Sequence, residues 1–279
     1  WGDVNNDGLP EENPTAGVNI YVITSEGFDS QNASKSVQIE AAAFPPVPIP
    51  AALYAEDFVT INGSSTTITG IDQCGGLSIP GVMTRYDINI LGQPEIYGNP
   101  DKLPRSATNY DVPGLINSLK GYANITPAPG LSTQTDGWGN LQTHETSSQV
   151  PLPNTCTDRN IVYVKGNLSL KSQGNQGCGI LLVDGDFMVD GGFKWYGPII
   201  VSGIIDFKGG GQRNITGAIV SGGTSVTVND EFGGNSVLFY CSSAIQFQTQ
   251  GRPLQMLRWS ADGQTDGQKS FINLINPEI

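Results

Sequence analysis

The chain has few charged residues, and basic ones above all are scarce. Charged residues make up 14% of its 279 residues, and 14 Lys and Arg stand against 26 Asp and Glu, which leaves a formal net charge of −12. A surface of this charge repels phosphate backbones and anionic lipid headgroups. We therefore expect no nucleic acid among its partners.

Long apolar runs and histidine are scarce as well. The most apolar run, residues 41–53, is interrupted by four prolines and is too short to span a bilayer. The one histidine, His144, has no cysteine nearby in the sequence, so we expect neither a metal centre nor a catalytic triad there. The sequence begins at Trp1 and not at Met, and we expect any signal or membrane anchor to lie upstream of it.

Cysteine occurs only four times, and never as a CxxC pair. An even set of isolated cysteines favours two disulfides over a zinc site, and hence a compartment outside the cytosol. Cys156 and Cys178 precede consecutive copies of the repeat described below, which would place them side by side and leave Cys74 with Cys241. Other pairings, and four free buried thiols, remain open alternatives.

Glycine is abundant, and part of it recurs at a regular spacing. A Val-x-Gly element occurs in IVYVKGNLSL (161–170), GILLVDGDFMVDG (179–191), PIIVSGIIDF (198–207) and GAIVSGGTSV (217–226). A fainter copy, ALYAEDFVTI (52–61), has Asp57 at the glycine position. Superposing the four clear copies gives a valine column of Val164, Val183, Val201 and Val220 and a glycine column of Gly166, Gly185, Gly203 and Gly222.

The steps between these copies are 19, 18 and 19 residues, which fits three short strands and three tight corners. Recurrence at a fixed step indicates successive turns of chain that stack on one another. The sequence therefore predicts an all-β fold, a β-solenoid (β-helix) that we expect to be right-handed. Its near-continuous apolar runs indicate strands covered on both faces. The alternative is a β-sandwich whose strands recur with similar spacing.

Two domains are predicted. Residues 1–44 form a small N-terminal β region, and residues 45–279, which open with the proline-rich FPPVPIP connector, form the solenoid domain. The repeat is lost over about 73–157, which we interpret as an excursion with one short helix, where Asp111 is the N-cap and Leu115, Ile116 and Leu119 follow at helical spacing. The apolar C-terminal segment 254–263 is expected to cap an end of the stack.

The N-terminal stretch WGDVNNDGLPEEN has the alternating oxygen ligands of a calcium loop, with Gly8 allowing the sharp turn. The acid that closes an EF-hand loop would fall at Pro14, so the stretch departs from that pattern. A plain Asp-Gly turn is the alternative. The predicted calcium ligands are Asp3, Asn5, Asp7, the Leu9 carbonyl, and Glu11 or Glu12.

Three aspartates of the repeat could carry chemistry. Asp184 and Asp186 share a strand face by their spacing, and Asp206 could lie one coil on. Clustered carboxylates on a β-helix can supply the acid and base of a polysaccharide-cleaving enzyme. Few basic residues stand nearby to stabilise developing charge, only Lys165 and Lys208.

Three stretches resemble the PilX-like type IV pilus assembly proteins, large minor-pilin-like subunits of Gram-negative bacteria. They are PPVPIPAALYAEDFVTING (45–63), GCGILLVDGDFMVDGGFKWYGPIIVSG (177–203) and VLFYCSSAI (237–245), and the resemblance covers most of residues 33–259. It implies a cleaved leader and a long apolar N-terminal helix, so this chain would be the exported ectodomain. It also implies a role in priming or decorating the fibre without catalysis.

We therefore expect a non-catalytic extracellular subunit of a type IV pilus, exported across the inner membrane and acting in pilus assembly or tip adhesion. Its expected partners are other pilin subunits or pilus tip proteins, and surface glycans. Trp138, Tyr110 and Tyr97 could offer aromatic contacts, although core packing is the other use for such rings. The alternatives are a secreted β-helix polysaccharide lyase or hydrolase, and a glycan-binding module.

Overall fold

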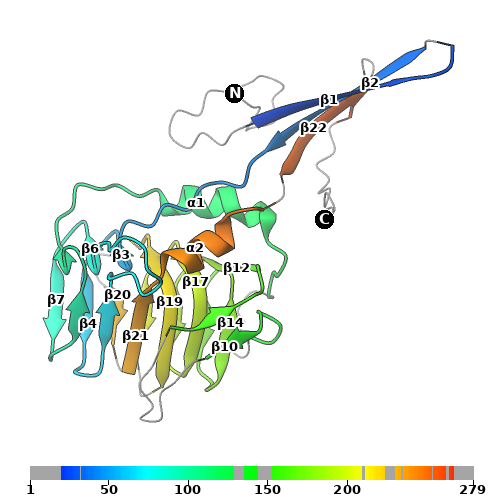
Figure 1. Cartoon of the computed structure of the whole chain (residues 1–279). Helices are drawn as coiled ribbons and strands as arrows, with labels where there is room; N and C mark the ends of the chain where they lie inside the picture. The colour runs from blue at the N-terminus through cyan, green and yellow to red at the C-terminus, as the bar shows by residue number, and fades with distance from the viewer. Residues whose placement is uncertain are drawn as a thin grey trace. The chain divides into compact units, whose positions relative to one another are not determined.

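The computed structural model describes residues 20–31, 33–128, 135–143, 153–208, 211–223, 230–233, 235–252, 254–261 and 264–266. Their regular secondary structure is mostly β-strand, as Figure 1 shows, which confirms the all-β prediction. None of their helices is long and apolar enough to cross a membrane. The chain divides into two compact units, residues 1–46 with 249–279, and residues 47–248.

The first unit contains an antiparallel sheet in the strand order β1-β2-β22-β23. Its strands are β1 (Ile20–Phe28), β2 (Ser34–Ala42), β22 (Gln255–Ala261) and β23 (Gln264–Asp266). The segment predicted as a cap, 254–263, contributes β22, which pairs with β2 and belongs to this first unit, and its role as a cap stays a prediction. An isolated hairpin is marginally stable in water, and β22 gives β1 and β2 a third strand.

The second unit contains two parallel sheets between which the chain alternates. Strands β15, β16 and β17, for example, lie in the larger sheet, the smaller sheet and the larger sheet again. The larger sheet holds β3 (Leu53–Ala55), β5 (Thr67–Thr69), β6 (Val82–Thr84), β8 (Glu95–Tyr97), β9 (Lys102–Leu103), β12 (Ile161–Lys165), β14 (Asn175–Cys178), β15 (Ile180–Asp184), β17 (Phe193–Val201), β19 (Gln212–Ser221) and β21 (Asn235–Tyr240). The smaller sheet holds β4 (Val59–Asn62), β7 (Ile88–Leu91), β13 (Leu168–Leu170), β16 (Phe187–Val189), β18 (Ile205–Phe207) and β20 (Asp230–Phe232).

Consecutive copies of the repeat lie side by side, with one change of register. Val164 is the partner of Val183, and Val183 of Val201, as the valine column predicts. The next partner of Val201 is Ser221 and not Val220. The offset between neighbouring turns rises from 18 residues at Val189 and Phe207 to 20 residues at Phe193 and Arg213, because the glycine-rich corner between Phe207 and Arg213 is longer.

Along the glycine column, the backbones of successive turns lie very close to one another. A Cβ added to Gly203 would collide with the Asp186 carboxylate and would lie 2.8 Å from the Gly185 carbonyl carbon. Gly185 packs in the same way on Gly166, whereas the glycine that lies on Gly203 is Gly223, so the predicted place of Gly222 in the column is wrong by one residue. At Gly185 and Gly203 glycine is therefore needed for space.

The turns do not stack in the order of the sequence. Strand β3 lies between β19 and β6, β5 lies between β21 and β8, and β4 lies between β20 and β7. The faint first copy at 52–61 thus adjoins the last clear copy, and Figure 1 shows β4 and β7 at one end of the unit with β12 and β14 at the other. The strands between Val82 and Leu103 form a further turn, so only the later part of the predicted excursion leaves the stack.

Both faces of the larger sheet are covered. Inside the stack, Phe187, Phe207 and Phe232 follow one another with ring centroids 5.3 Å apart. Outside it, α1 (Val112–Leu119) contacts β15 and β17, and its N-cap Asp111 accepts a hydrogen bond from Gly114 N as predicted. Short elements extend this layer, namely 3-10 helix η1 (Lys120–Tyr122), β10 (Leu141–Gln142), β11 (Thr155–Cys156) and a second helix, α2 (Ser242–Thr249), which the sequence analysis did not predict.

Candidate functional site

The predicted calcium site cannot be placed. The calcium ligands Asp3, Asn5, Asp7, Leu9, Glu11 and Glu12 lie outside the described residues, as does His144. Calcium binding at this loop therefore stays a prediction.

The three aspartates considered for catalysis have separate partners. Tyr163 donates to Asp184 Oδ2 at 3.0 Å, and the backbone N–H of Ile204 donates to Asp186 Oδ1 at 3.1 Å. Asp206 forms a 3.0 Å ion pair with Lys208. Asp206 lies in the smaller sheet directly beside Met188, whereas Asp184 ends a strand of the larger sheet. Asp184 and Asp206 thus lie in different sheets, and each of the three carboxylates has a partner of its own.

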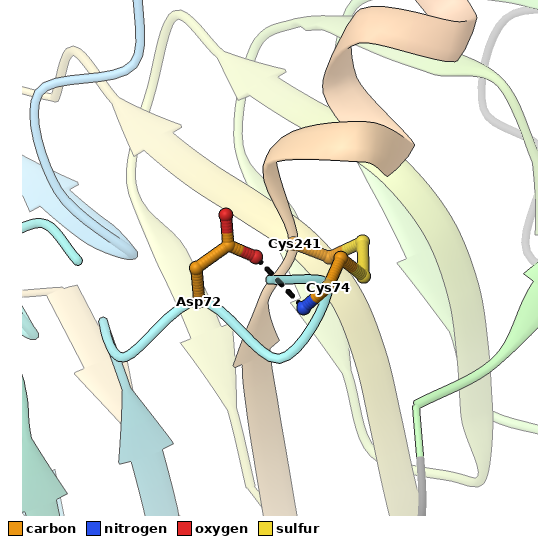
Figure 2. Close-up of side chains that lie close together, drawn as sticks. All are labelled: Asp72, Cys74 and Cys241. Carbon is orange, nitrogen blue, oxygen red and sulfur yellow. Dashed lines mark hydrogen bonds between the residues drawn. A yellow bond between two sulfur atoms is a disulfide. The ribbon is translucent and has the colours of Figure 1, made fainter. Parts of the chain in front are cut away.

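The first pair of cysteines joins the ends of two neighbouring strands that are far apart in the sequence. Cys74, which follows β5, is bonded to Cys241, which follows β21, with their Cα atoms 5.1 Å apart. Figure 2 shows Asp72 beside this disulfide, where its Oδ1 accepts hydrogen bonds from Cys74 N at 2.9 Å and Ser242 N at 3.2 Å. Because Ser242 opens α2, the Asp72 carboxylate caps the positive end of that helix.

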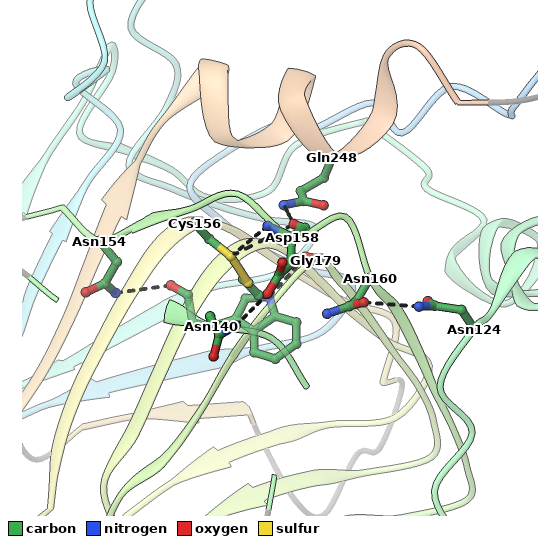
Figure 3. Close-up of a disulfide and its surroundings, with 10 residues drawn as sticks. Asn124, Asn140, Asn154, Cys156, Asp158, Asn160, Gly179 and Gln248 are labelled. Atoms are coloured by element: carbon green, nitrogen blue, oxygen red, sulfur yellow. Dashed lines mark hydrogen bonds between the residues drawn. A yellow bond between two sulfur atoms is a disulfide. The ribbon is translucent and has the colours of Figure 1, made fainter. Parts of the chain in front are cut away.

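The second disulfide, Cys156–Cys178, ties the outer layer to β14. Figure 3 shows Asp158 next to it, with its carboxylate accepting from Asn140 N at 2.6 Å and its carbonyl accepting from Gln248 Nε2 at 2.9 Å. Each disulfide has an aspartate close to its sulfurs, but the bonded sulfurs are not thiolates and so are poor metal ligands. Both predicted pairings are observed, and two disulfides indicate an oxidising environment, extracellular or periplasmic.

A buried carboxylate stands at the corner that follows β3. Glu56 is 5% exposed and accepts hydrogen bonds from the Tyr54 hydroxyl at 2.5 Å and from Tyr110 N at 2.7 Å. Arg85, from the next turn, forms a 3.1 Å ion pair with the same carboxylate. Burial, and then the hydrogen bond to Glu56, raises the pKa of Tyr54. This cluster fastens the segment that leads to α1 onto the stack.

The outer side of the same corner carries exposed aromatic rings. Phe58 and Tyr86 stack with centroids 5.0 Å apart and an interplanar angle of 26°, and they are 36% and 49% exposed. The neighbouring Asp87 holds the Arg105 guanidinium through two bonds, 2.7 Å from Nε to Oδ1 and 2.9 Å from Nη2 to Oδ2. Arg105 N also donates to the Tyr86 carbonyl at 2.9 Å. We call these four residues, Phe58, Tyr86, Asp87 and Arg105, the aromatic corner.

Arg105 adopts a backbone conformation that is unusual for its type. Its φ is 55°, and among the described residues it is the only one besides glycines with a positive φ. Side chains other than glycine adopt this region at a cost, and residues so held concentrate at functional sites. The conformation brings Arg105 beside Tyr86 and Asp87, two residues that precede it by a whole turn of chain.

The predicted aromatic contacts have different outcomes. Trp138 is 3% exposed and packs edge-on against Trp195, so it serves the core, and Tyr110 is half-buried. Tyr97 is 44% exposed. The sequence analysis missed Phe58 and Tyr86 because nothing in the sequence indicates that the turns holding them are neighbours.

Strand β1 forms one edge of the sheet in the first unit. It pairs with β2 along all nine residues, and no other described strand pairs with it. The described side chains of β1 are all exposed, and they include Tyr21, Val22, Ile23 and Phe28. The strand contains no proline and no basic residue. Natural proteins usually protect a free edge with such residues, and an unprotected apolar edge is prone to pair with another strand.

The comparisons with known proteins give no relative. Neither protein-family models, nor curated protein sequences, nor solved structures match this chain. Function is therefore argued from the geometry above.

Proposed function

We propose that this chain is the ectodomain of a PilX-like minor pilin, a non-catalytic extracellular subunit that acts in pilus assembly or adhesion. The resemblance of residues 45–63, 177–203 and 237–245 to that family motivates the proposal. The free edge of β1 is the observation that carries it. A fibre subunit needs a surface that joins it to its neighbours, and a nine-residue edge strand offers a continuous row of backbone donors and acceptors.

The β1 edge suits pairing with a strand of another subunit. Its side chains are apolar or small apart from Glu26, so a paired strand would meet one charge along nine residues. Main-chain hydrogen bonds supply affinity in this mode, and alternate side chains supply selectivity. Tyr21 and Ile23, which are 46% and 42% exposed, lie on one face of the strand and would be shielded by the partner.

The second unit suits a load-bearing part of the same subunit. We propose that its two parallel sheets form a right-handed β-solenoid, since parallel crossover connections are nearly always right-handed. The parallel register of neighbouring turns supports the solenoid. Two disulfides tie separate turns and the outer layer together, which suits an exported protein that must resist unfolding.

The proposal is tested in cells that produce the whole protein and its pili. A photo-crosslinking residue at Ile23 should link the protein to a pilin subunit in the sheared pilus fraction. The same residue at Leu77, which is 88% exposed on the second unit, is the matched control and should give no such product. Val22→Lys should reduce the protein in the pilus fraction, because a lysine on an edge strand opposes pairing.

One combination of results would contradict the pilus assignment. If the protein is absent from sheared pili, and Ile23 and Leu77 give the same crosslinks, the chain is no pilus subunit.

A further inference from the structure

The aromatic corner has features that neither packing nor assembly accounts for. Phe58 and Tyr86 expose their rings to solvent, although they come from two different turns of the stack. Contiguous exposed apolar surface on a protein can serve as a binding site, whereas scattered exposed apolar residues are normal. The site also includes the one described residue other than glycine with positive φ, Arg105.

We propose that the aromatic corner binds a neutral pyranose residue of a glycan. The ring face of a tyrosine or phenylalanine carries a negative quadrupole, which attracts the weakly positive C–H groups that line one face of a pyranose. The Phe58 and Tyr86 rings stack on each other, with centroids 5.0 Å apart and 26° between their planes, so the outer face of a ring is what remains to receive a sugar.

Asp87 and Arg105 supply the polar half of such a site. A planar carboxylate that accepts and a planar guanidinium that donates can together bind vicinal hydroxyl groups. The two-bond pairing of Arg105 with Asp87 fixes both planes before a ligand arrives. The bond from Arg105 N to the Tyr86 carbonyl holds the backbone of Arg105 beside that of Tyr86.

The charges at the corner favour an uncharged ligand over an anion. Arg105 is neutralised by Asp87, and Arg85, on the other side of Tyr86, is neutralised by Glu56. No excess positive charge is left among these residues for a phosphate, a sulfate or a uronic acid, and the whole chain carries −12.

The size of the site favours a small ligand over a protein. A stable protein interface needs about 800 Å² on each partner. The exposed apolar surface of the corner consists of two partly exposed rings. A sugar ring, by contrast, covers one aromatic ring with one face.

The inference rests on the adhesive part of the proposed function, and the binding surface it concerns is separate from the edge of β1.

Binding is tested with the purified chain, disulfides intact. The probes are the methyl glycosides of glucose, galactose, mannose and N-acetylglucosamine, screened by saturation-transfer NMR and measured by calorimetry. We expect at least one to bind, and Phe58→Ala and Tyr86→Ala each to weaken it by about 3- to 10-fold. Asp87→Asn and Arg105→Lys should weaken it as well. Tyr97→Ala removes a ring whose exposure, 44%, lies between those of Phe58 and Tyr86, and should leave the affinity unchanged.

Three outcomes would overturn the proposal. They are the absence of binding by all four glycosides, binding that Tyr86→Ala does not change, and binding of glucuronate or inorganic phosphate in place of the neutral sugars. A circular dichroism melt of each variant shows whether it remains folded. Tyr86→Ala should still reach the pilus fraction, so loss of sugar binding with normal recovery in pili separates this inference from the pilus assignment.

Discussion

Val220 and Tyr54 are direct partners in neighbouring parallel strands, although one lies in the last clear copy of the repeat and the other in the first, faint one. The chain therefore begins in the middle of the stack and adds turns towards one end, as far as β8. After α1 it continues at the opposite end of the stack and adds turns back towards the middle. The two halves meet where β19 pairs with β3, and the contacts that close the stack join segments far apart in the sequence.

This arrangement predicts unequal effects of the two disulfides on stability. The Cys74–Cys241 bond closes a loop of 167 residues and Cys156–Cys178 one of 22. Chain-entropy reasoning gives about 5 kcal/mol for the first and about 3 kcal/mol for the second. We expect Cys74→Ser/Cys241→Ser to lower the urea midpoint more than Cys156→Ser/Cys178→Ser does. The reverse order would mean that the two halves of the stack are not held together at this point.

Substitutions in the glycine column should follow the space around each glycine. Gly203→Ala should cost about 2–3 kcal/mol of stability, because its Cβ would press on Asp186 and on the backbone of the preceding turn. Gly166, with φ of 96° and nothing within 4 Å of an added Cβ, should accept Asn for about 1 kcal/mol or less. Denaturant unfolding of both variants checks this, and equal losses would contradict close packing of the corners.

Arg213 should be important for stability although it forms no ion pair with any residue in the described part of the chain. It is 1% exposed, and its guanidinium donates to the carbonyls of Val189, Lys208 and Gly233, which lie in three successive turns. A lysine carries all its donors on one nitrogen and cannot reach every acceptor that the two guanidinium nitrogens Nη1 and Nη2 serve, so Arg213→Lys should cost about 2–4 kcal/mol. Arg105→Lys, whose side chain is 75% exposed, is the control and should cost about 1 kcal/mol or less.

Stability should fall in alkaline solution. Burial raises the pKa of Tyr110, Tyr196 and Tyr240 in the folded chain. In the unfolded chain these phenols ionise near pH 10, so above that pH the unfolded state has lost protons that the folded state still holds. The stabilisation is therefore complete below about pH 10 and is lost as the pH rises through the folded pKa values. The melting temperature should decline as the pH rises above about 10, and that of Tyr196→Phe should decline less steeply. A melting temperature of the parent that does not change with pH in this range would contradict burial of these hydroxyls.

Local features of the fold could be predicted from the sequence because they depend on neighbouring residues. The valine column, the Asp111 cap and the double-sided burial of the long apolar strands all follow from spacing and side-chain type. Helix α2 was missed because it has few apolar residues and they do not form a stripe along one face. Its start also depends on Asp72, a residue remote in sequence.

Long-range features could not be predicted in this way. A repeat period indicates that copies stack on one another. Each strand has two edges, however, and the period does not say which copy pairs with the second edge. The partners of β3 and of β22 are decided by that choice. The aromatic corner depends on it too, since Phe58 and Tyr86 meet only because β4 and β7 are neighbours.

The order of the turns is tested most directly by mapping the native disulfides. Non-reducing digestion and mass spectrometry of the native protein should recover a peptide joining Cys74 to Cys241 and another joining Cys156 to Cys178. A bond from Cys74 to Cys156 or Cys178 would place the first copy of the repeat beside the wrong turn and would contradict the fold described above.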